Sequence, residues 1–328
     1  MGRVPKLDVL PPALALMVLL AACSAADGDS PEATASETRT PSASVATPTS
    51  SGTPSASPEQ RPTPGPREQA RLDAALIDAA WDDDVRRARR LIRAGADVNH
   101  QDETQQSAYL IATSEGYVEL LDLTLRNGAR VNAKDSFNGT GLIRAAERGH
   151  AAVVGRLVQA GIALDHVNNL GWTALHEAVI LGDGDASALA TVRTLVAAGV
   201  DVTIPAVRDG LTALEHARNR GYDEIAALLQ RADRPVPQAD GQVLDAAAEG
   251  DADGVALALR HDARLERRDS ARRTPLLLAV VGDHVVVAEL LVNLGADPTI
   301  PDQDGTTALE HARSSSNDEI ARLLSRSR

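Results

Sequence analysis

The heptapeptide TALEHAR occupies residues 212–218 and returns, letter for letter, at residues 307–313, 95 residues later. The first copy continues as NRGYDEIAALL and the second as SSSNDEIARLL, so a shared frame carries changed residues at its polar positions. Self-similarity at a fixed spacing is the sequence signature of a repeat architecture. The two copies therefore predict a repeated structural unit.

Related phrases divide residues 74–328 into eight such units. The intervals between successive starts are 33, 33, 33, 39, 29, 33 and 33 residues. A sustained period near 33 residues predicts a stack of similar units, each of which contacts its neighbours. The starts are Ala74, Ser107, Thr140, Thr173, Thr212, Gly241, Thr274 and Thr307.

Each unit carries the signals of two short helices. A threonine at the start is a favoured N-cap, and Pro275 or an alanine follows in the first turn, where no backbone donor is needed. Apolar pairs at helical spacing, such as VVGRLV (residues 153–158) and VAELLV (residues 287–292), predict the second helix. One unit cannot bury both of its helices, so neighbouring units must stack. Glycines that end the second helix are predicted at Gly95, Gly128, Gly161, Gly199 and Gly295.

These units resemble ankyrin repeats, whose motif is Thr-Pro-Leu-His with Gly-Ala-Asp at the turn. The closest copies are residues 274–276 (TPL) and 173–176 (TALH), and residues 95–97 and 295–297 match the turn. The resemblance covers about residues 72–328. It implies an all-α solenoid, curved, with a helix-turn-helix and a hairpin loop in each repeat.

Two departures from the period predict irregular places in this solenoid. About six extra residues in the fourth repeat, within residues 182–192, indicate a longer loop between its two helices. The fifth repeat ends in RADRPVPQADG (residues 231–241), where Pro235 and Pro237 stand at the junction with the next repeat. We therefore expect two sub-arrays, repeats 1–5 in residues 71–234 and repeats 6–8 in residues 235–328, each ending in a TALEHAR repeat.

The N-terminus has the layout of a targeting signal. Arg3 and Lys6 precede an apolar run that ends in small residues, which predicts a signal peptide over residues 1–22. The run is too short for an uncleaved transmembrane anchor. The tetrad LAAC (residues 20–23) resembles the lipobox of bacterial lipoproteins, which implies lipidation of Cys23; ordinary cleavage near Ala26 is the alternative. We expect a chain anchored by lipid to the bacterial envelope outside the cytoplasm, or, with ordinary cleavage, a secreted or periplasmic one.

Residues 23–70 consist mainly of Ser, Thr, Pro, Ala and Gly. Such a composition cannot bury enough apolar surface to offset the entropy of ordering, so it predicts a disordered linker. This linker would separate the lipid anchor from the repeats.

The composition excludes several classes of function. A net charge of −13 and an aromatic content of 2 % argue against binding to nucleic acid. Cys23 is the one cysteine, which excludes a cysteine-rich zinc site. Among the eight histidines, His216 and His311 hold equivalent repeat positions, as do His150 and His284, which is what scaffold residues do, and no catalytic motif is present. We expect neither an enzyme nor a cofactor or metal site.

Binding to a protein is the function that remains. In ankyrin repeats, partners contact the hairpin tips and the exposed part of the first helix on the concave face. Exposed aromatic and arginine side chains are common interface anchors. The resemblance places partner contacts at Trp81, Phe137, Arg148, Leu170, Trp172, Leu181, Arg208 and Leu211.

We expect a non-enzymatic scaffold that binds one protein partner. A structural spacer is an alternative function, as is an inhibitor or immunity-type protein for an envelope enzyme or toxin. The polar last repeat indicates a capped end, which favours a monomer over end-to-end assembly.

Overall fold

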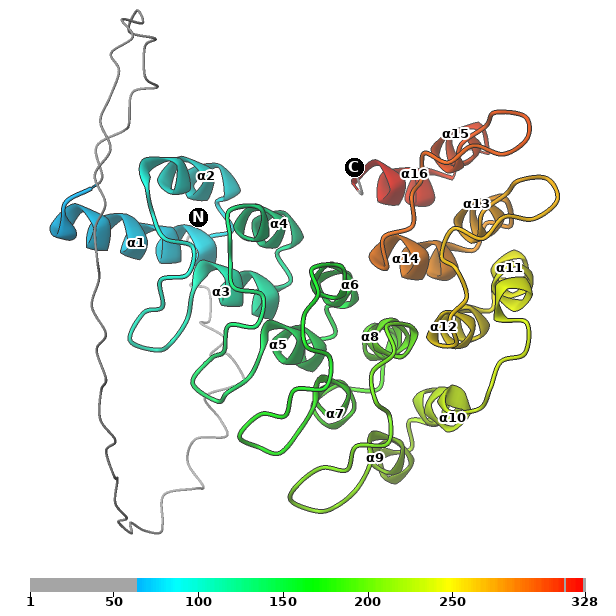
Figure 1. Ribbon diagram of the computed structural model, residues 1–328, viewed down its shortest axis with the longest axis horizontal. Helices are drawn as coiled ribbons and strands as arrows, with labels where there is room; N and C mark the ends of the chain where they lie inside the picture. Colours follow the sequence, from blue (N-terminus) through cyan, green and yellow to red (C-terminus); the bar gives the residue numbers. More distant parts are fainter. Residues whose placement is uncertain (1–63, 316, 327–328) are drawn as a thin grey trace, which may run out of the picture. The chain divides into compact units, whose positions relative to one another are not determined.

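The computed structural model describes residues 64–315 and 317–326 of the chain. Within this part the regular elements are helices, arranged as eight consecutive pairs (Figure 1). In chain order they are α1 (Pro66–Trp81), α2 (Val85–Ala94), α3 (Ala108–Glu115), α4 (Val118–Arg126), α5 (Gly141–Glu147), α6 (Ala151–Gln159), α7 (Ala174–Ile180), α8 (Ala186–Ala197), α9 (Ala213–Arg220), α10 (Asp223–Ala232), α11 (Ala239–Glu249), α12 (Ala252–Arg260), α13 (Pro275–Val281), α14 (Val285–Asn293), α15 (Ala308–Ser314) and α16 (Asp318–Arg326).

The threonine at the start of a repeat caps its first helix. The Thr274 hydroxyl accepts a hydrogen bond from the Leu277 amide at 3.2 Å. In each TALEHAR phrase the glutamate also bonds back to the threonine amide, so the phrase forms a capping box. Thr140 is an exception, because its buried hydroxyl has no hydrogen-bond partner among the described residues.

The predicted glycines end or directly follow the second helices. Gly95 is the C-cap of α2 with φ = 110°, a left-handed conformation that glycine adopts without strain. The other four predicted glycines also have positive φ. The sequence signal for the end of the second helix is therefore confirmed.

The buried apolar side chains form two clusters. One extends from Leu76 in α1 to Ala232 in α10, and the other from Val243 in α11 to Leu324 in α16. Leu257 of α12 belongs to the first cluster, although its neighbours along the chain belong to the second. Val236, which lies between Pro235 and Pro237, packs against both clusters.

The extra residues of the fourth repeat lengthen the loop between its two helices, as the sequence predicted, and they also lengthen its second helix. Residues 181–185 separate α7 from α8, whereas residues 148–150 separate α5 from α6. α8 has 12 residues, whereas α4, α6 and α14 have nine each. The added turn lets α8 pack directly against α12, past α10. Arg193 of α8 pairs with Asp253 of α12 at 2.7 Å, and the Arg260 Nη1 donates to the Val200 carbonyl at 2.6 Å.

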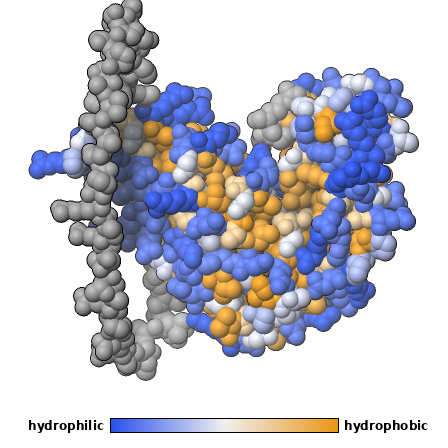
Figure 2. Space-filling view, in the orientation of Figure 1, coloured by the Kyte–Doolittle hydropathy of each residue, from blue (hydrophilic) through white to orange (hydrophobic). Residues whose placement is uncertain are grey.

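This packing decides which helices line the inside of the array. Figure 1 shows the second helices of the repeats, such as α6, α8, α12 and α14, on the inner side, with the first helices and the hairpin loops outside. The expectation that first helices and loop tips form the concave face is therefore wrong for this array. The cause is the close approach of α12 and α14 to α8 and α6. Hydrophobic residues gather over these inner helices in the space-filling view (Figure 2).

The N-terminal predictions lie mostly outside the described residues. These are the signal peptide, Cys23 and residues 24–63 of the linker. α1 begins at Pro66, four residues before the predicted end of the linker at residue 70, since proline is well suited to the first helical turn. Among the described helices, none combines the length and apolarity that a membrane span requires.

Candidate protein-binding surface

The hairpin loops of repeats 3, 4 and 5 are joined to one another by backbone hydrogen bonds. The Asn169 amide donates to the Phe137 carbonyl at 2.9 Å, and the Val207 amide donates to the Gly171 carbonyl at 3.0 Å. Each loop is also closed on itself by a short bridge or an Asx-type turn, as at Asp135, whose carboxylate accepts from the Phe137 and Gly139 amides at 2.8 Å. The three loops therefore form one ordered row, here called the tip row (residues 135–139, 168–172 and 206–211).

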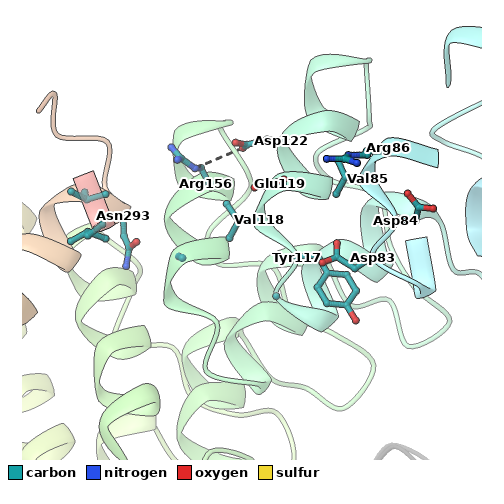
Figure 3. A pocket seen from close by; sticks show the side chains of 14 residues that line it. Asp83, Asp84, Val85, Arg86, Tyr117, Val118, Glu119, Asp122, Arg156 and Asn293 are labelled. Carbon is teal, nitrogen blue, oxygen red and sulfur yellow. Dashed lines mark ion pairs between the residues drawn. The ribbon is translucent and has the colours of Figure 1, made fainter. Parts of the chain in front are cut away.

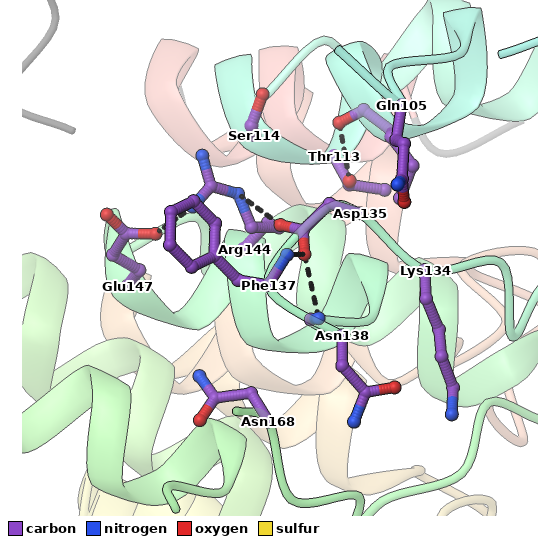
Figure 4. A network of polar contacts seen from close by, with 12 residues as sticks. Gln105, Thr113, Ser114, Lys134, Asp135, Phe137, Asn138, Arg144, Glu147 and Asn168 are labelled. Carbon is purple, nitrogen blue, oxygen red and sulfur yellow. Dashed lines mark hydrogen bonds and ion pairs between the residues drawn. The ribbon is translucent and has the colours of Figure 1, made fainter. Parts of the chain in front are cut away.

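Phe137 is the exposed aromatic residue of the tip row. Its side chain is 40 % exposed, and its amide donates to the Asp135 carboxylate, which also pairs with Arg144 of α5 (Figure 4). Arg144 pairs with Glu147 at 2.8 Å and with the Asp135 carboxylate at 3.5 Å. An exposed apolar ring thus projects from a loop whose backbone is fixed by polar contacts, and exposed aromatic side chains are common interface anchors.

Glu177 of α7 lies at the buried end of this polar network, and the sequence analysis missed it. Its Oε1 accepts a 2.6 Å hydrogen bond from Asn168, while its Oε2 is buried with no partner among the described residues. Burial, and then the nearby Glu147 carboxylate, raise the pKa of Glu177 to about 7. The sequence did carry a signal for Glu177. The position four residues after the start of the repeat holds a charged or titratable side chain in three consecutive repeats, namely Arg144, Glu177 and His216.

Trp172 and Leu170 are half-buried in the middle loop of the tip row. The amides of both residues donate to the Asn168 side-chain oxygen at 3.0 Å. Asn168 therefore joins the tip row to Glu177 below it. Because their backbones are fixed, these side chains would lose little conformational freedom on binding a partner.

The third loop supplies Leu211 and Arg208. The Leu211 carbonyl lies 3.3 Å from the Nε2 of His176, a buried histidine whose other ring nitrogen contacts the Thr173 hydroxyl at 2.9 Å. Burial lowers the pKa of His176. Arg208 is exposed and forms no ion pair with a described residue. His176 therefore links two loops.

The remaining predicted residues lie at the opposite ends of the first helices. Trp81 is the last residue of α1, while Arg148 and Leu181 are the C-caps of α5 and α7. First helices of seven to eight residues separate these positions from the tip row by about 10–12 Å. Arg148 pairs with Glu115 of the preceding repeat at 2.9 Å, whereas Trp81 and Leu181 are 48 % and 42 % exposed. The structure thus brings Phe137, Leu170, Trp172, Arg208 and Leu211 together and leaves Trp81, Arg148 and Leu181 on another edge.

A separate hollow of about 780 Å³ lies on the inner side of the array. Its wall comes from α2, α4 and α6, with Val292, Asn293 and Leu323 from the last two repeats (Figure 3). Arg156 and Asp122 form an ion pair at 3.7 Å inside it. The hollow has a mixed polar and apolar lining, and none of the predicted partner-binding residues reaches it.

Nothing in the described residues assembles a metal or catalytic site. No group of three or more His, Cys, Asp or Glu side chains in residues 64–315 and 317–326 is placed to hold a metal ion. The histidines instead connect neighbouring repeats: His150 contacts the Ser114 carbonyl at 3.1 Å, and His284 contacts the Ala248 carbonyl at 3.0 Å. These described histidines therefore serve as links between repeats.

A family model described as ankyrin repeats in three copies matches residues 109–206, 142–240 and 243–328. These matches together extend over more than half of the chain. The chain belongs to the ankyrin-repeat family. Its paired helices, capped first turns and linked hairpin loops agree with that assignment.

Individual ankyrin relatives match parts of the chain. The putative ankyrin repeat protein YahD of Escherichia coli K12 is 39 % identical over 142 residues, which cover 42 % of this chain and 69 % of YahD. A solved ankyrin repeat domain from Acinetobacter baumannii AYE is 46 % identical, with a TM-score of 0.47, and the match covers 48 % of this chain and 80 % of that one. The glycerophosphocholine phosphodiesterase gde1 of Schizosaccharomyces pombe is 34 % identical over 93 residues, 28 % of this chain and only 8 % of that enzyme.

Membership of the ankyrin family supports a general role. Ankyrin arrays are protein-binding scaffolds, and they are generally not enzymes. The match to gde1 is confined to a small fraction of that protein, so it transfers no activity to this chain.

Proposed function

We propose that this chain is a non-enzymatic scaffold outside the cytoplasm, held at the membrane by lipid on Cys23, which binds one protein partner through the tip row. The observation that carries the binding site is the position of Phe137. This exposed ring lies on a hydrogen-bonded loop whose Asp135 carboxylate pairs with Arg144. The partner contacts would centre on Phe137 and Trp172, with Leu170, Arg208 and Leu211 around them.

The rigidity of this surface supports the proposal. Backbone bonds between the loops and the Asn168–Glu177 contact fix the tip row before any partner arrives. Preorganised surfaces bind more tightly because less conformational entropy is lost. Truncation of a central aromatic anchor commonly weakens an interface by about 2 kcal/mol or more, which is roughly 30-fold in Kd.

Affinity capture from detergent-solubilised envelope tests the site, with residues 24–328 as bait. The wild type and the double variant Phe137→Ala/Trp172→Ala are compared. Val281→Ala/Val286→Ala is the matched control, because it removes two exposed apolar side chains in repeat 7. A protein that is retained by the wild type and the control but lost by the tip-row variant supports the site. Equal retention by all three baits rules it out.

The place of the chain in the cell is tested separately. Cys23→Ser should move the protein from the membrane fraction to the soluble fraction, and the wild-type protein should carry the mass of a lipid. The proposal of a lipid anchor fails if both proteins fractionate alike. The captured partner distinguishes the alternative functions. An enzyme or toxin would favour an inhibitor or immunity-type protein, and the absence of any captured protein would favour a spacer.

A further inference from the structure

One side of α2 is a stripe of arginines. Four of its ten residues, Arg86, Arg89, Arg90 and Arg93, follow the spacing i, i+3, i+4 and i+7, which places them on one face of a helix. All four are exposed, whereas Ala88 on the other side is fully buried. We call these four residues the arginine stripe.

Three of the four arginines have no ion-pair partner in the described part of the chain. Arg86, Arg89 and Arg90 form no ion pair with any residue that the structure describes, in contrast to Arg87, which lies 3.6 Å from the Asp82 carboxylate and 4.0 Å from that of Asp78. Like charges one helical turn apart repel, so the stripe destabilises α2 when it is left without an anionic partner.

Two of the nearby carboxylates are engaged elsewhere. Asp84 caps α2 by accepting a 2.8 Å hydrogen bond from the Arg87 amide. Asp122 of α4 pairs with Arg126 and Arg156 at 3.9 and 3.7 Å. Asp83 has its pKa raised by burial and by Glu119 of α4, so these two acids repel each other. Arg86, Arg89 and Arg90 therefore remain available in a chain whose net charge is −13.

The shape of the stripe favours a surface over a small ligand. From Arg86 to Arg93 it extends about 10 Å along the exposed side of a helix, with no enclosing wall around Arg89 and Arg90. Figure 2 shows a hydrophilic surface at α2, the end of the array, and Figure 3 shows Arg86 at the edge of the inner hollow. Guanidinium groups bind phosphates through two parallel hydrogen bonds, so a row of them matches a layer of phosphates.

The chain enters the array beside this stripe. Gly95, which caps the C-terminus of α2, lies against Pro64, and its carbonyl accepts a 2.9 Å hydrogen bond from Gln69 of α1. The 63 residues before Pro64, including Cys23, therefore join the array next to α2. A tether between a surface and a binding module turns a weak contact into an intramolecular one, with a high effective concentration.

We propose that the arginine stripe of α2 binds the anionic headgroup surface of the membrane to which the chain is anchored. This inference rests on the proposed lipid anchor for its setting in the cell, but not for its measurement in vitro. Contact through α2 would hold the first repeat at the membrane and leave the tip row of repeats 3–5 free for a partner.

Cosedimentation with vesicles tests the contact. The sample is the unlipidated chain of residues 24–328, which keeps every residue that the structure describes. The wild type should bind phosphatidylcholine vesicles that contain phosphatidylglycerol, and vesicles of phosphatidylcholine alone should bind little. At low ionic strength each arginine should contribute about fivefold, so Arg86→Gln/Arg89→Gln/Arg90→Gln should weaken the partition by roughly 100-fold. Added salt should weaken the wild type most.

A charge-matched variant separates the stripe from net charge. Arg218→Gln/Arg231→Gln/Arg234→Gln removes three exposed arginines from α9, α10 and the turn after α10, and it should bind vesicles like the wild type. An equal loss of vesicle binding in both triple variants would overturn the proposal. Equal binding of the wild type to vesicles with and without phosphatidylglycerol would also overturn it. So would stronger binding to a polyglutamate competitor than to vesicles. If the proposal of a lipid anchor is wrong, the protein isolated from the envelope fraction should instead have the mass of an unmodified chain.

Discussion

The side-chain amide of Gln159 donates a 2.8 Å hydrogen bond to the main-chain carbonyl of Asn293, which lies 134 residues later in the chain. Gln159 ends α6 in the third repeat, and Asn293 ends α14 in the seventh. One turn earlier on α6, Gly155 lies so close that a Cβ atom there would overlap the Asn293 carbonyl. The third and seventh repeats thus meet backbone to backbone, and this contact closes the inner side of the array.

Gly155→Ala should open this contact. Alanine favours a helix over glycine by about 1 kcal/mol, but here its methyl group has no space against the Asn293 backbone. We expect a loss of about 1–3 kcal/mol in the free energy of unfolding, as for overpacked cores, and a larger radius of gyration. Urea denaturation and small-angle X-ray scattering measure the two quantities.

Gly241→Ala is the matched control for this substitution. Gly241 is also helical, in α11, and nothing lies within 4 Å of the position that its Cβ would take. This variant should be as stable as the wild type, or more stable. If Gly155→Ala behaves in the same way, the close contact between α6 and α14 does not exist in solution.

Glu177 should make the array less stable as the pH rises. Its pKa in the folded chain is about 7, above the ordinary value of 4.5, so the folded state holds the proton more tightly than the unfolded state. The contribution of this group is therefore most favourable below pH 4.5 and decreases between pH 4.5 and 7. It is constant at higher pH, lower by up to about 3 kcal/mol.

Glu177→Gln removes this dependence, since glutamine resembles the protonated acid. The difference in unfolding free energy between the variant and the wild type should increase from pH 5 to pH 8 in favour of the variant. Urea denaturation at both values measures it, with the exposed Glu249→Gln as a control that should show no such trend. A constant difference for Glu177→Gln across this range would contradict the buried, proton-holding state.

Two threonines at equivalent positions should respond differently to valine. Thr274→Val keeps the shape but removes the cap that the hydroxyl provides to the Leu277 amide, a loss of about 1 kcal/mol. Thr140→Val replaces a buried hydroxyl that has no partner, so it should be neutral or stabilising. Thermal unfolding of the two variants compares them directly, and equal destabilisation would show that Thr140 is hydrogen-bonded in solution.

The Arg193–Asp253 pair should couple the two sub-arrays. Both side chains are mostly buried between α8 and α12, and their atoms lie 2.7 Å apart. A double-mutant cycle with alanine should give a coupling of about 1–3 kcal/mol. The exposed Arg322–Asp318 pair of α16, at 3.9 Å, should give less than about 0.5 kcal/mol. Similar couplings for both pairs would mean that α8 and α12 separate in solution.

The repeat units could be predicted from the sequence because their signals are local. A threonine that caps a helix, as at Thr274, and a glycine that ends one, as at Gly95, act within a few residues of themselves. The same local chemistry identified the loops that form the tip row. It could not show that Trp81 and Leu181 lie at the other end of the first helices, since no single motif fixes that distance.

The ankyrin character, the eight-repeat period and the glycines near the ends of the second helices were thus determined by the sequence alone, because each repeat encodes its own caps, apolar faces and turns. Only the tertiary structure decided how the array curves, which face is inner, and that Glu177 is buried without a full set of partners. Those features depend on contacts such as Gln159–Asn293 and Arg193–Asp253, which join residues 134 and 60 positions apart. Contacts at such separations leave no periodic trace in the chain, since they arise from the summed packing of many helices.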